Sequence, residues 1–349
     1  MSFRPSIPVI TGLVVAAVGG WLASLVGIPL PWMLGAIIAT LAAALLKAPI
    51  APPTAILAPM RATLGVLLGA SITPELLERF GELAVSLLFV PLFIIAATAL
   101  GLWYFTRITG MSRAEAFFSA LPGGLYTMVA FAEDMGVDIK RIALVHALRV
   151  TLVVMLLPFM VYFFAQGDAP LVPRPVTWFA DVPLRDLAFL TACAVVGWWV
   201  GTNLRIPGGA IIGPLVFSAA LHITGVTSAS PPMEAVVIAQ VVLGAAIGCR
   251  FVGVDPKEVS FALVHSLGFV VLMLALTVLF AWVISILVDI PTISGVLAFA
   301  PGGLAEMSLV ALSLRLDVGY VATLHVVRIL LVMCVAPSAY KLLRKRLTG

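Results

Sequence analysis

Long apolar stretches, separated by short polar segments, recur along the whole chain. A membrane-spanning helix needs about 17–25 predominantly apolar residues, and most of these stretches reach that length. In the first half they run over residues 7–26, 30–46, 56–72, 83–106, 113–131 and 139–165, and in the second over 184–204, 208–223, 233–251, 260–288, 291–314 and 318–340. The short alternating segments of a membrane β-barrel are absent. The pattern therefore predicts an all-α integral membrane protein.

Composition agrees with this interpretation and indicates which classes of binding partner to expect. Hydrophobic residues make up 62% of the chain and charged residues 10%, with a mean hydropathy of +1.19. A water-soluble domain needs far more polar surface. The basic tail KLLRKR, residues 341–346, is typical of a cytoplasmic anchor. The three cysteines are far apart and show neither a disulfide framework nor a metal-ligand spacing. We expect contact with the lipid bilayer, no nucleic-acid partner, no metal and no cofactor.

The second half of the chain repeats the first. A shift of 179 places aligns residues 121–158 with 300–337 without a gap, and 13 of the 38 aligned positions are identical. Shared Leu or Val means little in so apolar a sequence, whereas shared polar residues at fixed spacing are informative. The polar identities are Asp138, His146 and Arg149 with Asp317, His325 and Arg328. Duplication of one ancestral unit explains this agreement.

The duplication sets the predicted domain boundaries. Residues 1–165 form the first membrane repeat and residues 184–349 form the second. The polar, proline-containing segment between them, residues 166–183, is the predicted linker.

Each repeat interrupts one apolar segment with Pro-Gly-Gly. The interruptions are Pro122, Gly123 and Gly124 in the first repeat and Pro301, Gly302 and Gly303 in the second. Proline removes a helical hydrogen bond, and glycine adds conformations that other residues avoid. Exposed backbone at membrane depth is tolerated only where it is buried in protein or lines a wet cavity. Broken helices at matching positions of two halves point to the binding site of a transporter, although a purely structural kink is the alternative.

The distribution of Lys and Arg indicates how the broken segments sit in the membrane. If each segment dips in and returns, the repeats are inverted, and thirteen of the seventeen unburied basic residues lie on the cytoplasmic side with both termini. If each segment crosses, only ten lie there. The positive-inside rule favours the first arrangement. We predict about ten spanning helices, two Pro-Gly-Gly broken or re-entrant helices and inverted repeats; an unwound crossing helix is the alternative.

Ionisable residues within the apolar segments are candidates for the binding site. Arg149 and Arg328 each lie near the middle of a predicted span, where a charge usually faces a partner or a water-filled pathway. Two arginines can clamp a carboxylate or phosphate. The structural alternative is that they bond backbone carbonyls of the broken helices or pair with Glu133, Asp134 or Glu306.

The remaining candidates carry weaker signals. Glu306 occurs only in the second repeat, where the first has Thr127, and is a candidate for coupling-ion binding or for a salt bridge to Arg328. His146 and His325 are candidates for proton relay or for structural hydrogen bonds. Asp138 and Asp317 precede helices, which favours N-capping. Arg61 is a weaker candidate for the same cavity.

The duplicated PGGL blocks, at 122–125 and 301–304, and the segment IPLPWMLGA, at 28–36, resemble those of the AbrB family of bacterial integral membrane proteins. The resemblance covers essentially the whole chain and implies a duplicated hydrophobic module. Members are variously described as ammonia monooxygenases, as regulators of gene expression or as transporters. The chain does not resemble the unrelated small DNA-binding regulator of the same name.

The residues discriminate between these descriptions. An oxygenase needs clustered metal ligands, whereas the four histidines, His146, His222, His265 and His325, are scattered. A direct regulator of transcription needs a soluble reading module, and no loop is long enough. We therefore expect a secondary transporter, not an enzyme. It would move a small polar, anionic solute across the bacterial inner membrane by alternating access, with possible coupling to H+ or Na+. The alternatives are a channel for a small neutral species, lined by His146 and His325, and a membrane-bound oxidoreductase. The solute and the oligomeric state do not follow from the sequence.

Overall fold

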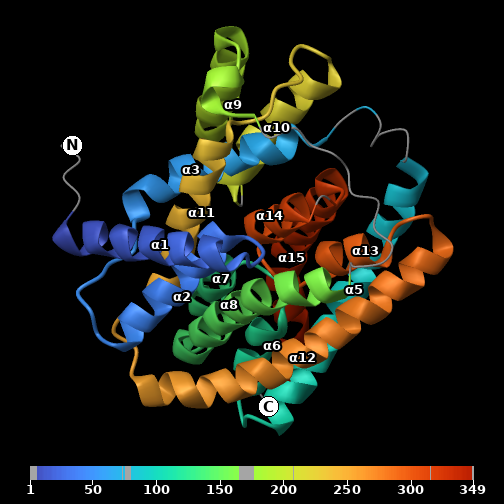
Figure 1. Ribbon diagram of the computed structural model, residues 1–349. Helices are drawn as coiled ribbons and strands as arrows, with labels where there is room; N and C mark the ends of the chain where they lie inside the picture. The colour runs from blue at the N-terminus through green and yellow to red at the C-terminus, as the bar shows by residue number, and fades with distance from the viewer. Residues whose placement is uncertain are drawn as a thin grey trace. The chain divides into compact units, whose positions relative to one another are not determined.

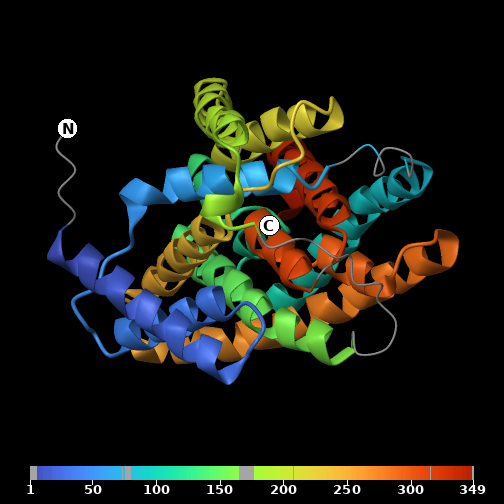
Figure 2. The same ribbon diagram turned by 45° about the horizontal axis from the view of Figure 1, so that its top comes forward.

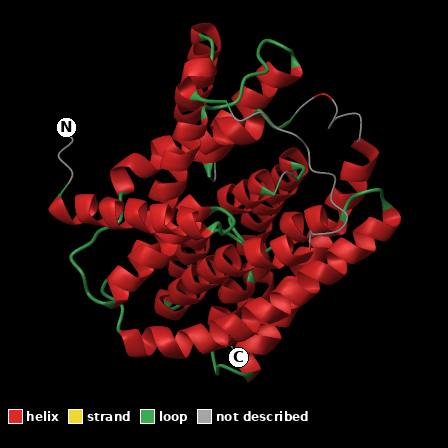
Figure 3. Cartoon of the chain, in the orientation of Figure 1, coloured by secondary structure: helices red, strands yellow, loops and turns green. Residues whose placement is uncertain are grey.

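The computed structural model describes residues 6–72, 74, 80–164, 177–206, 208–314 and 316–347. Within these ranges all regular structure is helical, and no strand occurs (Figure 3). Residues 166–176 of the predicted linker lie outside the described residues, as do Arg4, Arg79, Arg174 and Arg315, which entered the count of basic residues. The prediction of an all-α membrane protein is confirmed.

The helices of the two halves match in order and, for five pairs, in length. Helices α1, α2, α3, α6 and α7 have the same numbers of residues as α9, α10, α11, α13 and α14. The first half contains α1 (Ile7–Val26), α2 (Pro31–Leu45), α3 (Thr54–Gly69), α5 (Phe80–Arg107), α6 (Arg113–Ala120), α7 (Leu125–Asp134) and α8 (Ile139–Phe164). The second half contains α9 (Leu184–Asn203), α10 (Gly209–Ile223), α11 (Met233–Gly248), α12 (Pro256–Leu287), α13 (Thr292–Phe299), α14 (Leu304–Ser313) and α15 (Val318–Leu347). Two short 3-10 helices, Phe179–Asp181 and Cys249–Phe251, complete the described elements.

Seven segments of the described chain are long and apolar enough to cross a membrane. They are Ile7–Val26, Gly81–Arg107, Ile139–Val161, Leu184–Asn203, Met233–Phe251, Ala262–Leu287 and Val318–Leu343. Three further predicted spans, α2, α3 and α10, form apolar helices of 15 or 16 residues. These are shorter than the roughly 17 residues that a straight span requires. The total of ten spanning helices therefore stays a prediction.

The long helices present apolar side chains outward, as contact with lipid requires. On α5, Leu88, Leu92 and Ile95 are 72%, 54% and 66% exposed. Their spacing of four and three residues places them on one helix face. On α12, Val264, Val271 and Trp282 are also exposed. Exposed apolar stripes of this kind suit the hydrocarbon core of a bilayer and would be unfavourable in water.

The chain forms two compact units, and each unit combines helices from both halves. The first contains α1, α2 and α3 with α9, α10 and α11. The second contains α5, α6, α7 and α8 up to Leu156, together with α12 from Lys257, α13, the start of α14 and α15 from Tyr320. The sequence repeats are thus interleaved in space. The repeat boundaries stay a prediction.

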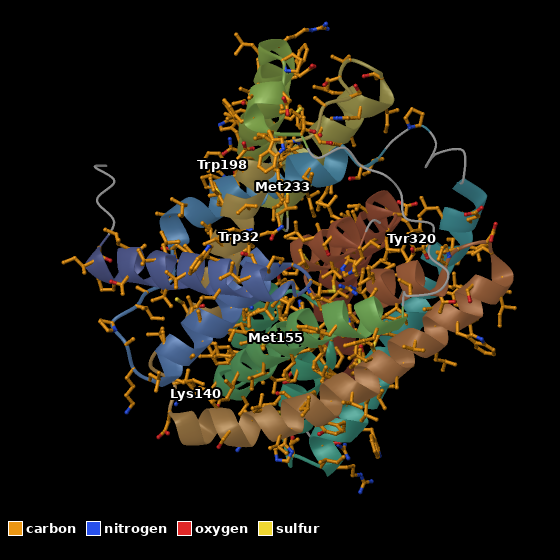
Figure 4. All side chains as sticks on the ribbon, viewed as in Figure 1. Trp32, Lys140, Met155, Trp198, Met233 and Tyr320 are labelled. Carbon is orange, nitrogen blue, oxygen red and sulfur yellow. The ribbon has the colours of Figure 1, made fainter. Side chains whose placement is uncertain are left out.

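In the first unit, glycines let paired helices approach closely. Figures 1 and 2 both show α1 beside α2. A Cβ atom on Gly35 would lie 2.2 Å from the carbonyl oxygen of Gly19, and one on Gly213 would lie 2.0 Å from that of Gly197. The two contacts are related by a shift of 178 residues, so both repeats pack their first two helices in the same way. Trp32, labelled in Figure 4, packs against Gly20 at the same crossing.

The core of the second unit joins the two repeats. The short helices α6 and α7 pack against α15, where Phe117 and Phe118 contact the ring of Tyr340 with centroid distances of 5.8 Å and 4.9 Å. Near the other end of α15, Tyr320, labelled in Figure 4, donates a hydrogen bond of 3.0 Å to Ser86 Oγ on α5. The broken segments are therefore held by helices from both halves of the chain.

Candidate functional site

The sequence of each Pro-Gly-Gly segment explains why two short helices form. In the first repeat a capping box starts α6, because Ser112 and Glu115 satisfy each other's backbone N–H groups. The residue before a proline is driven out of the helical region, and Leu121 has φ −57° and ψ 129°. Its counterpart Ala300 has φ −52° and ψ 138°. Helices α7 and α14 then begin immediately after the second glycine.

The buried arginines bond the carbonyl groups that these breaks release. Arg149 on α8 donates from Nη1 to the carbonyl oxygen of Leu121 at 2.8 Å and from Nη2 to that of Gly123 at 2.9 Å. Its side chain is 2% exposed. A broken helix leaves carbonyls without helical partners, and an unpaired buried carbonyl is costly. The guanidinium therefore stabilises the break, as the structural alternative from the sequence predicts.

The second repeat reproduces this arrangement at positions shifted by 179. Arg328 on α15 donates from Nη1 to the carbonyl oxygen of Ala300 at 2.5 Å and from Nη2 to that of Gly302 at 2.9 Å. Its side chain is 3% exposed. The duplication detected in the sequence thus extends to individual hydrogen bonds.

The histidines one turn earlier on the same helices are buried and also bond the broken segments. His146 Nε2 lies 2.9 Å from the carbonyl oxygen of Phe118, and His325 Nε2 lies 2.9 Å from that of Leu297. Because a carbonyl can only accept, each Nε2 must donate. Nδ1 of His325 accepts from Nη2 of Arg328 at 2.7 Å, whereas Nδ1 of His146 has no partner among the described residues. Both rings have structural roles; proton relay stays a prediction.

Each arginine keeps one nitrogen without a partner. The Nε atoms of Arg149 and Arg328 are buried and make no hydrogen bond within the described chain. No hydrogen bond or ion pair joins either arginine to Glu133, Asp134 or Glu306 among the described residues, so the predicted salt-bridge alternative is not observed. This leaves two buried guanidinium groups without an ion pair among the described residues, and burying an unpaired charge is costly.

Methionines explain why the first glycine of each motif is needed, a role that the sequence did not suggest. A Cβ atom on Gly123 would lie 2.9 Å from Sδ of Met128, and one on Gly302 would lie 2.8 Å from Sδ of Met307. The glycines of these motifs do not adopt a positive φ. The requirement is for space. Both methionines recur in the aligned motifs, and that was the available signal.

The two repeats differ at one position beside the break. Glu306, in the first turn of α14, is 8% exposed and makes no hydrogen bond or ion pair within the described chain. Its Oε2 atom lies 2.0 Å from the position that a Cβ on Gly303 would occupy. The carboxylate therefore lies directly over Gly303. In the first repeat Thr127 stands in this place, 3.8 Å from the equivalent position on Gly124.

The three weaker candidates lie at the starts of α8 and α15 and on α3. Asp138 accepts a hydrogen bond of 3.0 Å from the backbone N–H of Lys140, which confirms its predicted N-capping of α8. Asp317 immediately precedes α15 and is half-buried. Arg61 is half-buried on α3, which belongs to the first unit, whereas Arg149 and Arg328 belong to the second.

Comparison with known proteins places the chain in a family. The family model described as transition state regulatory protein AbrB matches residues 32–344. An uncharacterized protein of Bacillus subtilis (strain 168), YhjN, is 29% identical over 367 aligned residues, which cover 95% of this chain and 92% of that protein. A candidate regulator of Escherichia coli (strain K12), AbrB, is 25% identical over 291 residues and 82% of each chain. Because the family match spans most of the sequence, the protein belongs to the AbrB family of membrane proteins.

Proposed function

We propose that this protein is a secondary transporter that moves a small anionic solute across the bacterial inner membrane. The observation that supports this most directly is the pair of buried arginines. Arg149 and Arg328 use their terminal nitrogens to hold two broken helices, and each keeps a buried Nε–H donor without a partner in the described chain. An anion between them would supply the missing acceptors and neutralise the charge.

The helix termini beside the arginines favour the same ligand. Helices α7 and α14 begin at Leu125 and Leu304, directly after the Pro-Gly-Gly motifs. Backbone N–H groups at a helix N-terminus carry partial positive charge and bind anions. In membrane transporters, half-helix N-termini serve this purpose at the substrate site. We propose that each pair of short helices is a discontinuous membrane helix and that α7 and α14 contribute their N-termini to one solute site.

Alternating access between inverted halves is the proposed mechanism, driven by H+ or Na+. Gly123, Gly302, Arg149 and Arg328 all belong to the second compact unit, so a single unit carries both halves of the site. The channel alternative requires His146 and His325 on a pore wall. Both rings are fully buried and bonded to backbone carbonyls, which gives that alternative no support.

Uptake into proteoliposomes tests the proposal, using a solute chosen by a thermal-shift screen of small metabolites against purified protein. Arg149→Lys and Arg328→Lys keep the positive charge, but a lysine ammonium cannot bond two carbonyls in a fixed fork and also present Nε. We expect each change to reduce uptake by about tenfold or more, equivalent to about 1.4 kcal/mol. Arg141→Lys, an exposed change on the same helix, is the matched control. Unchanged uptake in both site variants would refute the assignment.

Membrane topology tests the inverted arrangement. We expect residues 113 and 140, which flank the first pair of short helices, to lie on the cytoplasmic side together. Arg113→Cys and Lys140→Cys, each in a background without Cys193, Cys249 and Cys334, can be labelled with an impermeant maleimide in vesicles of known orientation. Labelling from opposite sides would show that the segment crosses the membrane and would rule out inverted repeats.

A further inference from the structure

The two halves of the proposed site differ in one respect. A side-chain carboxylate of the protein lies at the helix N-terminus in the second half and not in the first. The first half-site consists of Gly123, Gly124, Thr127 and Arg149, and the second consists of Gly302, Gly303, Glu306 and Arg328. In the second, the Glu306 carboxylate lies over Gly303 at the start of α14, 92% buried and without a hydrogen bond in the described chain.

A carboxylate in this place has the chemistry of the proposed solute. It is an anionic group at the N-terminus of a ten-residue helix, beside the Gly302 carbonyl that Arg328 holds. The negative charge of Glu306 would repel a solute carboxylate that approaches α14, and the Glu306 side chain already fills the space there. The protein therefore supplies its own anion at the second half-site.

The first half-site lacks such an occupant. Thr127 is uncharged, its hydroxyl oxygen lies 3.8 Å from the position of a Cβ on Gly124, and Gly124 itself is exposed. The backbone N–H groups at the start of α7, the hydroxyl of Thr127 and the free Nε–H of Arg149 are all hydrogen-bond donors. No carboxylate lies at this helix terminus, and these groups are the kind of donor that an anionic group of a solute needs.

We infer that Glu306 limits the site to solutes with a single anionic group, which binds at the first half-site beside Thr127. This inference rests on the proposed function, and it adds the charge class of the solute and the residue that selects it. A solute with two anionic groups would place its second group against the Glu306 carboxylate. Discrimination of this kind is a difference between two binding energies, set by repulsion as much as by attraction.

The repeat symmetry provides a reciprocal test, because the residue of each half-site can be transplanted into the other. The measurement is the shift in the apparent melting temperature of purified protein when an anion is added. The monoanions acetate and lactate are compared with the dianions malonate and succinate, all as sodium salts at equal pH and ionic strength. The wild type should be stabilised more by the monoanions. Glu306→Thr should be stabilised more by the dianions, and Thr127→Glu should lose stabilisation by either class. Combining both changes moves the open half-site to α14 and should restore the wild-type order.

Controls separate the inference from the proposed function. Glu133→Gln removes an exposed charge from the end of α7 and should keep the wild-type order. If Glu306→Thr does not accumulate, Glu306→Gln replaces it, because it removes the charge with little change of shape. Monoanion preference retained in the Glu306 variant would overturn the inference and leave the proposed function standing. If no anion stabilises the wild type or any variant, both fall.

Discussion

Arg149→Met and Arg328→Met should each lower the free energy of unfolding substantially, in addition to abolishing uptake. Each arginine donates to one buried carbonyl oxygen, that of Leu121 or Ala300, and to one partly buried carbonyl oxygen, that of Gly123 or Gly302. Methionine fills a similar volume but donates no hydrogen bond. Leaving a buried acceptor unpaired costs about 1–3 kcal/mol, so we expect a loss of about this size per variant, to which the partly buried acceptor adds less. Thermal or chemical unfolding of purified protein in detergent measures the loss.

The matched control for these variants is Arg141→Met on α8, because Arg141 is exposed and makes no interaction in the described chain. It should unfold like the wild type. If Arg149→Met and Arg328→Met also unfold like the wild type while uptake is lost, the carbonyl bonds contribute little stability. The arginines would then serve the solute alone.

The positions of the breaks were predictable from sequence because their cause is local. Pro122 and Pro301 exclude the helical conformation from the residue before them, and that residue is extended in both repeats. The duplication was predictable for a related reason. Polar residues such as His146 and Arg149 are rare in apolar segments, so their recurrence at a fixed shift cannot reflect composition. The same reasoning identified the buried residues that contact the breaks.

The partners of those buried residues were not predictable, because they depend on how distant segments pack. The sequence left Arg328 free to bond a solute, a carbonyl or Glu306, and only the structure shows that it bonds the carbonyls of Ala300 and Gly302. The grouping of helices from both halves into each compact unit is likewise a tertiary property. Periodicity and composition describe single segments and carry no information about such pairings. The role of Met128 and Met307 was not predictable, because their recurrence in the aligned motifs does not show which backbone atoms their side chains contact.

Gly123→Ala and Gly302→Ala should impair the protein more than Gly124→Ala, although all three changes add a single methyl group. At Gly123 and Gly302 the new Cβ would lie 2.8–3.0 Å from three side-chain atoms of Met128 or Met307, both of which are fully buried. Overpacking of this kind costs about 1–3 kcal/mol, and relieving it would shift the backbone whose carbonyls the arginines hold. At Gly124 the nearest atom to a new Cβ would be Thr127 Oγ1 at 3.8 Å, an ordinary contact. Gly123→Ala should therefore be less stable to unfolding in detergent than Gly124→Ala, and its uptake in proteoliposomes should be lower. Equal losses in the two variants would show that the glycines act through backbone conformation instead of space, and the explanation based on Met128 would be wrong.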